Sequence, residues 1–220
     1  MNQKATLGLL GGTGALGLGL AKRWLASGYK VVIGSRSMER GKESVESLKQ
    51  TIPGADVSCL DYLSTARVAD VIVVVVPFSS HAETLELIRD AAQGKVVIDA
   101  VVPLVPPKVS TVQMPQEGSA SLIAQSILGE EAFVVGAFHN VAASKLQAEG
   151  PIDCDVLVCG NHQPARESVL ELVRALGLRG IDVGVLQNSI AMEAMTSLLI
   201  GINRRYKSDA AGIRITGISA

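Results

Sequence analysis

The sequence predicts an α/β protein of the Rossmann type, in which a doubly wound, mainly parallel sheet is followed by a smaller C-terminal helical lobe. Three observations predict this fold class. Short apolar runs alternate with amphipathic stretches of about a dozen residues. A glycine-rich turn joins the first apolar run to the first amphipathic stretch. The run 71–76 ends in four consecutive valines, a composition typical of a strand that is covered on both faces.

The predicted elements follow in chain order. Residues 6–10 form an apolar run before the glycine turn and are expected to be the first strand. Residues 15–27 form a helix that ends at Gly28, because glycine is the usual residue just beyond a helix C-terminus. The same alternation then predicts strands at 30–34, 55–59, 71–76 and 95–99, and helices at 38–50 and 80–92.

The pattern changes after residue 99. Prolines 103, 106, 107 and 115 prevent regular structure and predict a long loop, which is a candidate binding loop. Beyond the loop we expect a helix at 119–128, strands at 133–137 and 155–159, and helices at 164–176 and 190–206. A boundary near Glu149-Gly150-Pro151 would divide the chain into a Rossmann-type domain, 1–150, and a smaller C-terminal part, 151–220.

Composition excludes several classes of protein. The 220 residues contain 20 basic and 21 acidic side chains, so the chain has no overall basic field for binding nucleic acid or an anionic membrane. Its three cysteines lack the spacing of a metal site and are expected to be reduced thiols in a cytoplasmic protein. A charge-free stretch at 5–21 resembles a signal peptide in composition, but its glycines argue against one.

The glycine turn carries a dinucleotide motif. Gly12, Gly14 and Gly17 form a G-x-G-x-x-G run between a predicted strand and a predicted helix. Gly12 permits the tight turn, Gly14 lets a pyrophosphate approach the backbone, and Gly17 allows the helix to pack closely on the strand. Free amide groups at the start of the helix would then face the anion. The sequence therefore predicts dinucleotide binding.

The residues after the second strand indicate which dinucleotide is bound. Sites that prefer NAD carry an acidic residue here for the ribose hydroxyls, but this chain has Ser35 and Arg36, with Arg40 one helical turn further on. Two guanidinium groups and a hydroxyl are suited to a 2′-phosphate. We therefore expect NADP(H). The alternative is that these side chains only form the solvated start of a helix.

Further candidates lie at the ends of other strands. Val75, Val76 and Pro77 end the central strand at the carboxyl edge, where ligands of open α/β sheets bind, so they contact the nucleotide or belong to the core. His139 follows an apolar strand and either orients a cofactor or is a structural histidine. Transfer of a hydride to or from NADP(H) depends on closeness and orientation more than on an acid or base, so no essential general acid or base is expected. The spacing of the histidines and cysteines predicts no metal site.

Several segments carry a resemblance to a known family. The first is Leu9-Leu10-Gly11-Gly12-Thr13-Gly14-Ala15-Leu16-Gly17 with Gly34-Ser35-Arg36. Later ones follow in order: Val102-Pro103-Leu104-Val105-Pro106, Phe138-His139-Asn140-Val141-Ala142-Ala143, Asp155-Val156-Leu157-Val158-Cys159-Gly160 and Gln187-Asn188-Ser189. With these segments the chain resembles, along its length, the NADP oxidoreductases that use the 8-hydroxy-5-deazaflavin coenzyme F420.

The resemblance implies a homodimer that transfers a hydride between reduced F420 and NADP. It assigns the nucleotide to Thr13, Gly14, Ala15, Leu16, Ser35 and Arg36, with Arg40 where the family usually has lysine. It implies that the nicotinamide and the deazaflavin lie against each other at Leu104 and Ala143. It also implies that the segment at Ala211 closes the same cavity.

Two alternatives remain open at this point. The family usually has threonine at position 140 and proline at 142, whereas this chain has Asn140 and Ala142. These positions belong to the side of the second substrate. An NADPH-dependent reductase of another flavin, or of a small imine or carbonyl compound, is one alternative. A non-catalytic NADP(H) sensor is the other.

Overall fold

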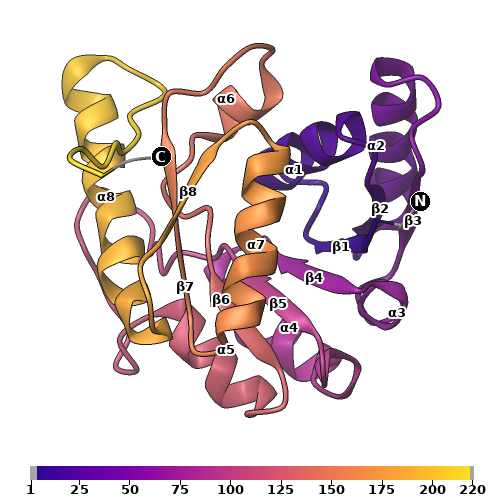
Figure 1. Ribbon diagram of the computed structural model, residues 1–220, viewed down its shortest axis with the longest axis horizontal. Coiled ribbons are helices and arrows are strands. Elements are labelled where there is room, and N and C mark those ends of the chain that lie inside the picture. Colours follow the sequence, from indigo (N-terminus) through magenta and orange to yellow (C-terminus); the bar gives the residue numbers. More distant parts are fainter. Residues whose placement is uncertain (1–3, 219–220) are drawn as a thin grey trace.

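A computed structural model describes residues 4–218 of the chain (Figure 1). Within those residues, eight strands form one sheet in the order β3-β2-β1-β4-β5-β6-β7-β8. The neighbouring strands are parallel except β6 and β7, which are antiparallel. Strand order reverses between β1 and β4, which is the switch point of a doubly wound sheet. The predicted fold class is confirmed.

The bounds of the elements are as follows. The strands are β1 (Thr6–Leu10), β2 (Lys30–Gly34), β3 (Val57–Leu60), β4 (Val71–Val74), β5 (Val96–Asp99), β6 (Phe133–Gly136), β7 (Asp155–Gly160) and β8 (Arg179–Asp182). The α-helices are α1 (Ala15–Ala26), α2 (Met38–Thr51), α3 (Tyr62–Val68), α4 (His81–Ile88), α5 (Ala120–Leu128), α6 (Ala143–Gln147), α7 (Gln163–Ala175) and α8 (Ser189–Tyr206). Short 3-10 helices cover Phe78–Ser80, Asp90–Ala92 and Leu186–Asn188.

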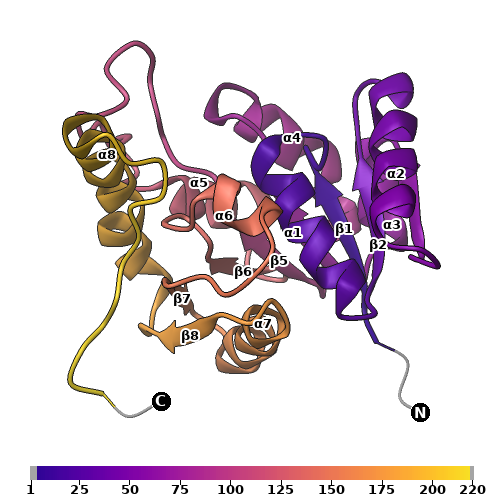
Figure 2. The ribbon, with the colours of Figure 1, turned by 90° about the horizontal axis from the view of Figure 1, so that it is seen from above.

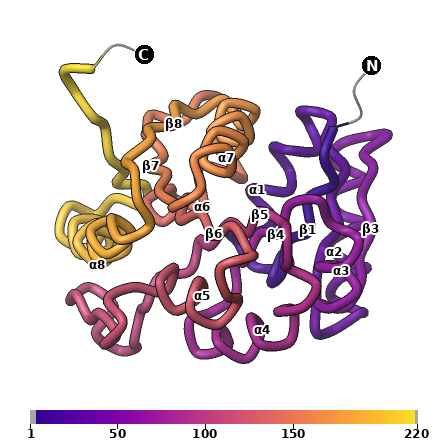
Figure 3. The backbone as a smooth tube through the Cα atoms, turned by 60° about the horizontal axis from the view of Figure 1, so that its bottom comes forward, coloured from indigo at the N-terminus to yellow at the C-terminus, as the bar shows by residue number. Residues whose placement is uncertain are grey.

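The sheet has a hydrophobic core on each face, because successive side chains of a strand point to opposite sides. In β4, Val71 and Val73 pack into the core beneath α1 and α7. Ile72 and Val74 pack into the core beneath α3, α4 and α5. Figure 3 shows α1 and α7 on one side of the sheet and α4 and α5 on the other. Both faces of the central strands are therefore covered, as the valine run predicts.

Several predicted elements differ from the structure in their bounds. β4 ends at Val74, after which Val75 donates one more hydrogen bond to Leu10 and Pro77, which has no amide hydrogen, starts a 3-10 turn. The predicted helix 80–92 divides into α4 and a short 3-10 helix. These differences place Val75 and Val76 beyond the strand, at the carboxyl edge of the sheet.

Two α-helices and one strand were not predicted. Residues 62–68 form α3, which begins after Asp61, whose side chain accepts a hydrogen bond from the Ser64 amide. Residues 143–147 form α6, a helix too short to show a 3.6-residue pattern. Residues 179–182 form β8, an edge strand with no buried residue and only one large apolar side chain, Ile181.

Residues beyond 150 contribute both strands and helices. β7 joins the sheet through two pairs of residues with β6, and β8 follows as the edge strand. α7 lies beside α1 in the same layer (Figure 1). The indole of Trp24 in α1 donates a 3.0 Å hydrogen bond to the Leu172 carbonyl in α7. The division at residue 150 stays a prediction.

Candidate functional site

The glycine turn has the geometry of an anion site. Gly11 has a φ of +85°, which favours glycine, and the amide of Gly14 donates a 3.0 Å hydrogen bond to the Gly11 carbonyl. A Cβ on Gly17 would lie 2.7 Å from the Gly12 Cα, so α1 reaches the turn only because residue 17 is glycine. No side chain caps α1 at Gly14. The first amides of the helix are therefore available to a pyrophosphate.

The next turn, after β2, carries the expected basic side chains. Arg36 and Arg40 are both exposed. The Ser35 hydroxyl is buried and donates a 2.7 Å hydrogen bond to the Ser37 carbonyl, while the Ser37 side chain caps α2. The turn therefore orders the chain around Arg36, and the proton of the Ser35 hydroxyl is used within the turn.

A pocket of about 440 Å³ lies beside Arg36, between α3 and α4. Its lining includes Ser35, Arg36, Tyr62, Thr84 and Leu87. Burial raises the pKa of the Tyr62 phenol, and the nearby Arg36 guanidinium opposes that rise. This pocket could not be predicted from the sequence, because two of its lining residues, Tyr62 and Leu63, belong to α3, which was not predicted.

A central cavity of about 350 Å³ lies at the carboxyl edge of the sheet. It brings together residues that follow the ends of three strands, β4, β5 and β6, and residues of α1, α6 and α8. Its predicted lining residues are Leu16, Val75, Val76, Pro77, Leu104, His139 and Ala143. It is also lined by Phe78, Ala100, Val101, Val102, Phe138, Val141 and Thr196, which were not proposed as site residues. Most of these side chains are apolar, so the walls suit a flat ring.

A second cavity, of about 370 Å³, adjoins the first. The two share His139, Val141, Ala143 and Thr196. Its far wall includes Asn203, Asp209 and Ala211, and the Ala211 amide donates a 2.9 Å hydrogen bond to the Asn203 side chain. Ala143 therefore stands between two neighbouring spaces, and Ala211 belongs to the outer one.

The predicted residues thus fall into three groups. Gly12, Thr13, Gly14 and Ala15 form the turn after β1 and the start of α1. The central and outer cavities bring together the apolar candidates and His139. Arg36 and Ser35 line the pocket at α3 and α4, whereas Arg40 lines none of the cavities described here.

Phe138 lines the central cavity and has a strained backbone conformation. Its φ is +67°, a conformation that a bulky side chain rarely adopts. The ring is buried and packs edge to face on Trp24 of α1, with the ring centroids 5.8 Å apart. Such strain persists only where the surroundings enforce it, and it is common at binding sites. The signal available in the sequence is its position two residues after the end of β6.

α8 is docked against the residues that follow Phe138. The Thr196 hydroxyl donates a 2.9 Å hydrogen bond to the His139 carbonyl, and the Asn140 side chain donates to the Met192 carbonyl at 3.0 Å. Asn140 also donates to the Thr196 hydroxyl at 3.2 Å. These bonds fix the wall that the two cavities share, and they give a structural role to Asn140.

Four buried ionisable side chains lie next to the cavities. His81 bonds to Asp99 at 2.9 Å, and the Nε2 atom of His139 is 3.8 Å from a carboxylate oxygen of Glu193. Burial lowers the pKa of His139 to about 4. Burial and the Asp99 carboxylate raise the pKa of Glu193 to about 7. His139 is therefore neutral near pH 7, and neither of its ring nitrogens has a hydrogen-bond partner within the described residues.

Residues 4–218 contain no group of three or more histidine, cysteine and acidic side chains arranged to hold a metal ion. No helix in this range has the length and apolar character needed to cross a membrane.

Sequence comparison identifies relatives over the whole chain. Residues 6–103 match the family described as NADP oxidoreductase coenzyme F420-dependent. The chain is 39% identical to the F420-dependent NADP reductase of Methanocaldococcus jannaschii, over 96% of this chain and 98% of that protein. It is 38% identical to the F420-dependent NADP reductase of Methanothermobacter thermautotrophicus, over 96% and 95% of the two chains.

Structural comparison gives the same fold. A solved structure from Arthrobacter sp. FB24 has a TM-score of 0.81 and covers 97% of this chain and 100% of its own, at 22% identity. A glycine turn at the switch point of a doubly wound sheet, with a mostly apolar cavity at the carboxyl edge of the same sheet, defines a dinucleotide-binding protein of the Rossmann type. Within that class, the chain belongs to the family of coenzyme F420-dependent NADP oxidoreductases.

Proposed function

We propose that this protein is an enzyme that transfers a hydride directly between NADP(H) and coenzyme F420. The observation that supports this most strongly is the pair of adjoining cavities that share Ala143, of which the mostly apolar central one reaches Leu16 at the dinucleotide turn. Two flat rings need such neighbouring spaces to meet face to face. The relatives reported above, which are named F420-dependent NADP reductases, favour F420 as the second ring.

The nucleotide half of the site follows from the two turns. Gly12 and Gly14 would shape the turn, because their amides donate within it, and the amides of Thr13, Ala15 and Leu16 would hold the pyrophosphate at the start of α1. Arg36 and Arg40 would bind the 2′-phosphate, with Ser35 shaping the turn beneath them. The pocket lined by Tyr62, Thr84 and Leu87 would take the adenine end of the nucleotide.

The ring half of the site follows from the cavities. Val75, Val76 and Pro77 would pack against the nicotinamide end of the nucleotide, and Leu104 and Ala143 would lie where the two rings meet. Ala211 would close the outer cavity over the second ring. His139 would shape the wall, and no side chain would act as an essential general acid or base.

The function is tested by mixing purified protein with NADPH and F420 and following the absorbance of oxidised F420. We expect loss of that absorbance, and little turnover with FMN or with a cyclic imine. Turnover of FMN or the imine without F420 would favour the alternative reductases. NADPH binding without turnover of any acceptor would favour the sensor.

We further propose that the protein is a cytoplasmic homodimer and that residues 151–220 form a C-terminal part serving both the site and the dimer. Thr196, Asn203 and Ala211 line the cavities. On α8, Leu198, Ile202 and Tyr206 are 55%, 43% and 73% exposed and are spaced four residues apart, so they share one helical face. Sedimentation velocity should give a dimer, and Leu198→Glu with Ile202→Glu should give a monomer.

A further inference from the structure

The short helix α6 connects the cavity wall with the dinucleotide turn. It has only five residues and no side chain caps its N-terminus. A helix of this length is not stable by itself in water. Its first residue, Ala143, lines both cavities. The position of this wall therefore depends on whatever holds α6 in place.

The C-terminal end of α6 is held by basic side chains of α1. Arg23 donates hydrogen bonds to the carbonyls of Leu146 at 2.9 Å and Ala148 at 2.9 Å, and Lys22 donates to the Gln147 carbonyl at 2.8 Å. The last carbonyls of a helix lack partners within the helix and favour nearby cations. Side chains of α1 thus supply the hydrogen-bond donors that the last carbonyls of α6 lack within their own helix.

The two helices approach each other very closely. A Cβ on Gly19 of α1 would lie 2.6 Å from the Leu146 Cβ, a distance that real side chains do not reach. The Leu146 side chain is fully buried in the same core as α1. Figure 2 shows α6 lying next to α1. The close approach of α1 and α6 therefore requires glycine at position 19.

A further hydrogen bond is donated by α6 and accepted at the start of α1, next to the dinucleotide turn. The Gln147 side-chain amide donates a 2.7 Å hydrogen bond to the carbonyl of Ala15. Ala15 is the first residue of α1 and follows Gly14 of the turn. The two ends of α6 thus contact the two halves of the site: Ala143 faces the cavities, and Gln147 contacts the start of the helix that would hold the pyrophosphate.

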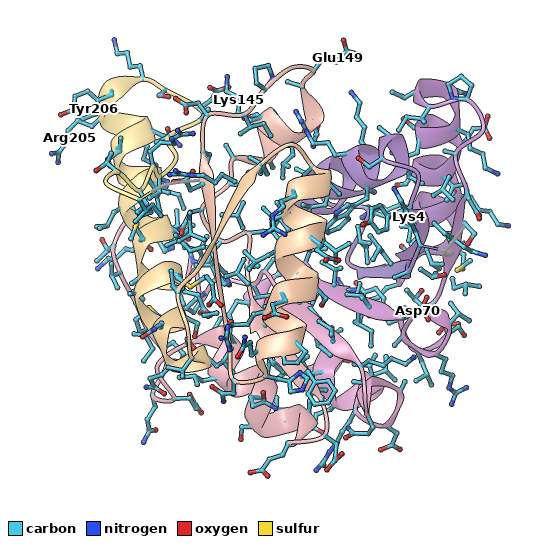
Figure 4. All side chains as sticks on the ribbon, viewed as in Figure 1. Lys4, Asp70, Lys145, Glu149, Arg205 and Tyr206 are labelled. Carbon is cyan, nitrogen blue, oxygen red and sulfur yellow. The ribbon has the colours of Figure 1, made fainter. Side chains whose placement is uncertain are left out.

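We infer that Gln147 and Arg23 are positioning residues that fix the distance between bound NADP(H) and the Ala143 wall against which the second ring lies. This inference rests on the proposed function. NADP(H) bound at the start of α1 would restrain Ala15, and the Gln147 hydrogen bond would transmit that restraint to α6. Lys145, by contrast, points away from the molecule on the outer side of α6 (Figure 4).

The test uses Gln147→Met, which keeps the size of the side chain and removes its donor. The matched control is Gln93→Met, because Gln93 is also exposed and also donates from its amide to backbone carbonyls, those of Arg89 and Leu128, far from the site. Hydrogen-deuterium exchange of residues 143–150 is measured with and without saturating NADP⁺ in both variants and in the wild type.

We expect NADP⁺ to slow exchange at 143–150 in the wild type and in Gln93→Met, and to have no such effect in Gln147→Met. In a single turnover with NADPH and F420, Gln147→Met should transfer the hydride roughly two- to ten-fold more slowly, as the loss of one hydrogen bond implies. Its affinity for NADPH should stay within about two-fold of the wild type. Arg23→Lys, which keeps the charge but not the fork of donors, should show a loss of the same kind.

Unchanged exchange at 143–150 when NADP⁺ binds the wild type, or an equal effect in Gln147→Met, would overturn the inference. A wild type that does not bind NADP⁺ would overturn the proposed function and the inference together. A wild type that binds NADP⁺ but does not reduce F420 would overturn only the proposed second substrate, because the exchange measurement does not involve F420.

Discussion

The Nε2 atom of His139 lies 3.8 Å from Oε1 of Glu193, and both side chains are completely buried. Glu193 also accepts hydrogen bonds from the Ala120 amide at 2.6 Å and from the Ser121 amide and hydroxyl at 3.0 and 2.8 Å. One carboxyl group therefore holds the start of α5 and faces the histidine behind the cavity wall. The two groups have opposite effects on stability as the pH changes.

The Glu193→Gln variant should change the pH dependence of stability. Burial raises the folded pKa of Glu193 from an ordinary 4.5 to about 7. The folded state thus binds more protons at this group between those pH values, so its contribution to stability is full below pH 4.5 and falls as the pH rises towards 7. Glu193→Gln has no titrating group at this position and does not lose stability there as the pH rises. Its free energy of unfolding, relative to the wild type, should rise over this window by on the order of 3 kcal/mol.

Thermal or urea unfolding of both proteins across that pH range measures the difference. Burial lowers the folded pKa of His139 to about 4, so His139 contributes the opposite slope, a gain in stability as the pH rises from 4 to 6.5. That slope is common to both proteins and cancels in the comparison. Glu43→Gln, which changes an exposed carboxyl, is the control. A pH-independent difference between Glu193→Gln and the wild type would contradict the prediction.

Arg36→Ala should weaken NADPH binding roughly ten- to a hundred-fold and barely change NADH binding. A charged hydrogen bond contributes about 1.5 to 3 kcal/mol, and only NADPH carries the 2′-phosphate. Fluorescence titration with both nucleotides measures the effect. Arg67→Ala removes another exposed arginine, at the far end of α3, and should change neither affinity. Equal losses of affinity for NADPH and NADH in Arg36→Ala would show that the guanidinium does not bind the 2′-phosphate.

Ala143→Phe should abolish turnover with F420 while leaving the affinity for NADPH mostly intact. The new ring would occupy the boundary between the two cavities, whereas the adenosine half of the nucleotide would bind at Arg36. Steady-state turnover and an NADPH titration separate the two effects. Ala26→Phe, at the exposed end of α1, is the control for the added ring. Undiminished turnover of F420 in Ala143→Phe would place the second ring elsewhere.

Much of the fold could be predicted from the sequence, because its signals are local. β1 and β2 match the predicted ranges, since each is a short apolar run closed by glycine. β8 could not be predicted, because an edge strand with half-buried residues shows no alternation of apolar and polar side chains. α3 is only seven residues long and depends on its Asp61 cap more than on an apolar pattern.

The candidate site divides in the same way. The dinucleotide turn and Val75 to Pro77 could be located because the carboxyl ends of parallel strands form the binding edge of the sheet. Thr196 and Asn203 could not, because they come from α8, and which face of that helix meets the cavities is decided by hydrogen bonds to residues 139 and 140 far earlier in the chain. The same holds for Glu193, whose partners lie more than 70 residues away.

His139→Ala should lower the turnover of NADPH and F420 by about ten-fold or less. Two facts support this expectation. Burial lowers the pKa of His139 to about 4, so near neutral pH the ring holds no extra proton to deliver. Its side chain is also completely buried on the side of Glu193, so the part of His139 that is best placed to shape the cavity is its backbone, whose carbonyl accepts from Thr196.

General acid or base catalysis typically contributes 10²- to 10⁴-fold, and removing such a group would cost at least that much. A lost contribution to ring orientation, on the order of 1 kcal/mol, costs far less and adds no new ionisation to the pH profile of turnover. The measurement is the single-turnover rate of hydride transfer across pH 5.5 to 8.5, about three units around neutrality, in a variant whose circular dichroism spectrum matches the wild type. A loss of about a thousand-fold would show that the histidine takes part in the chemistry. It would also favour an imine or carbonyl substrate over a deazaflavin, because those substrates need a proton delivered together with the hydride.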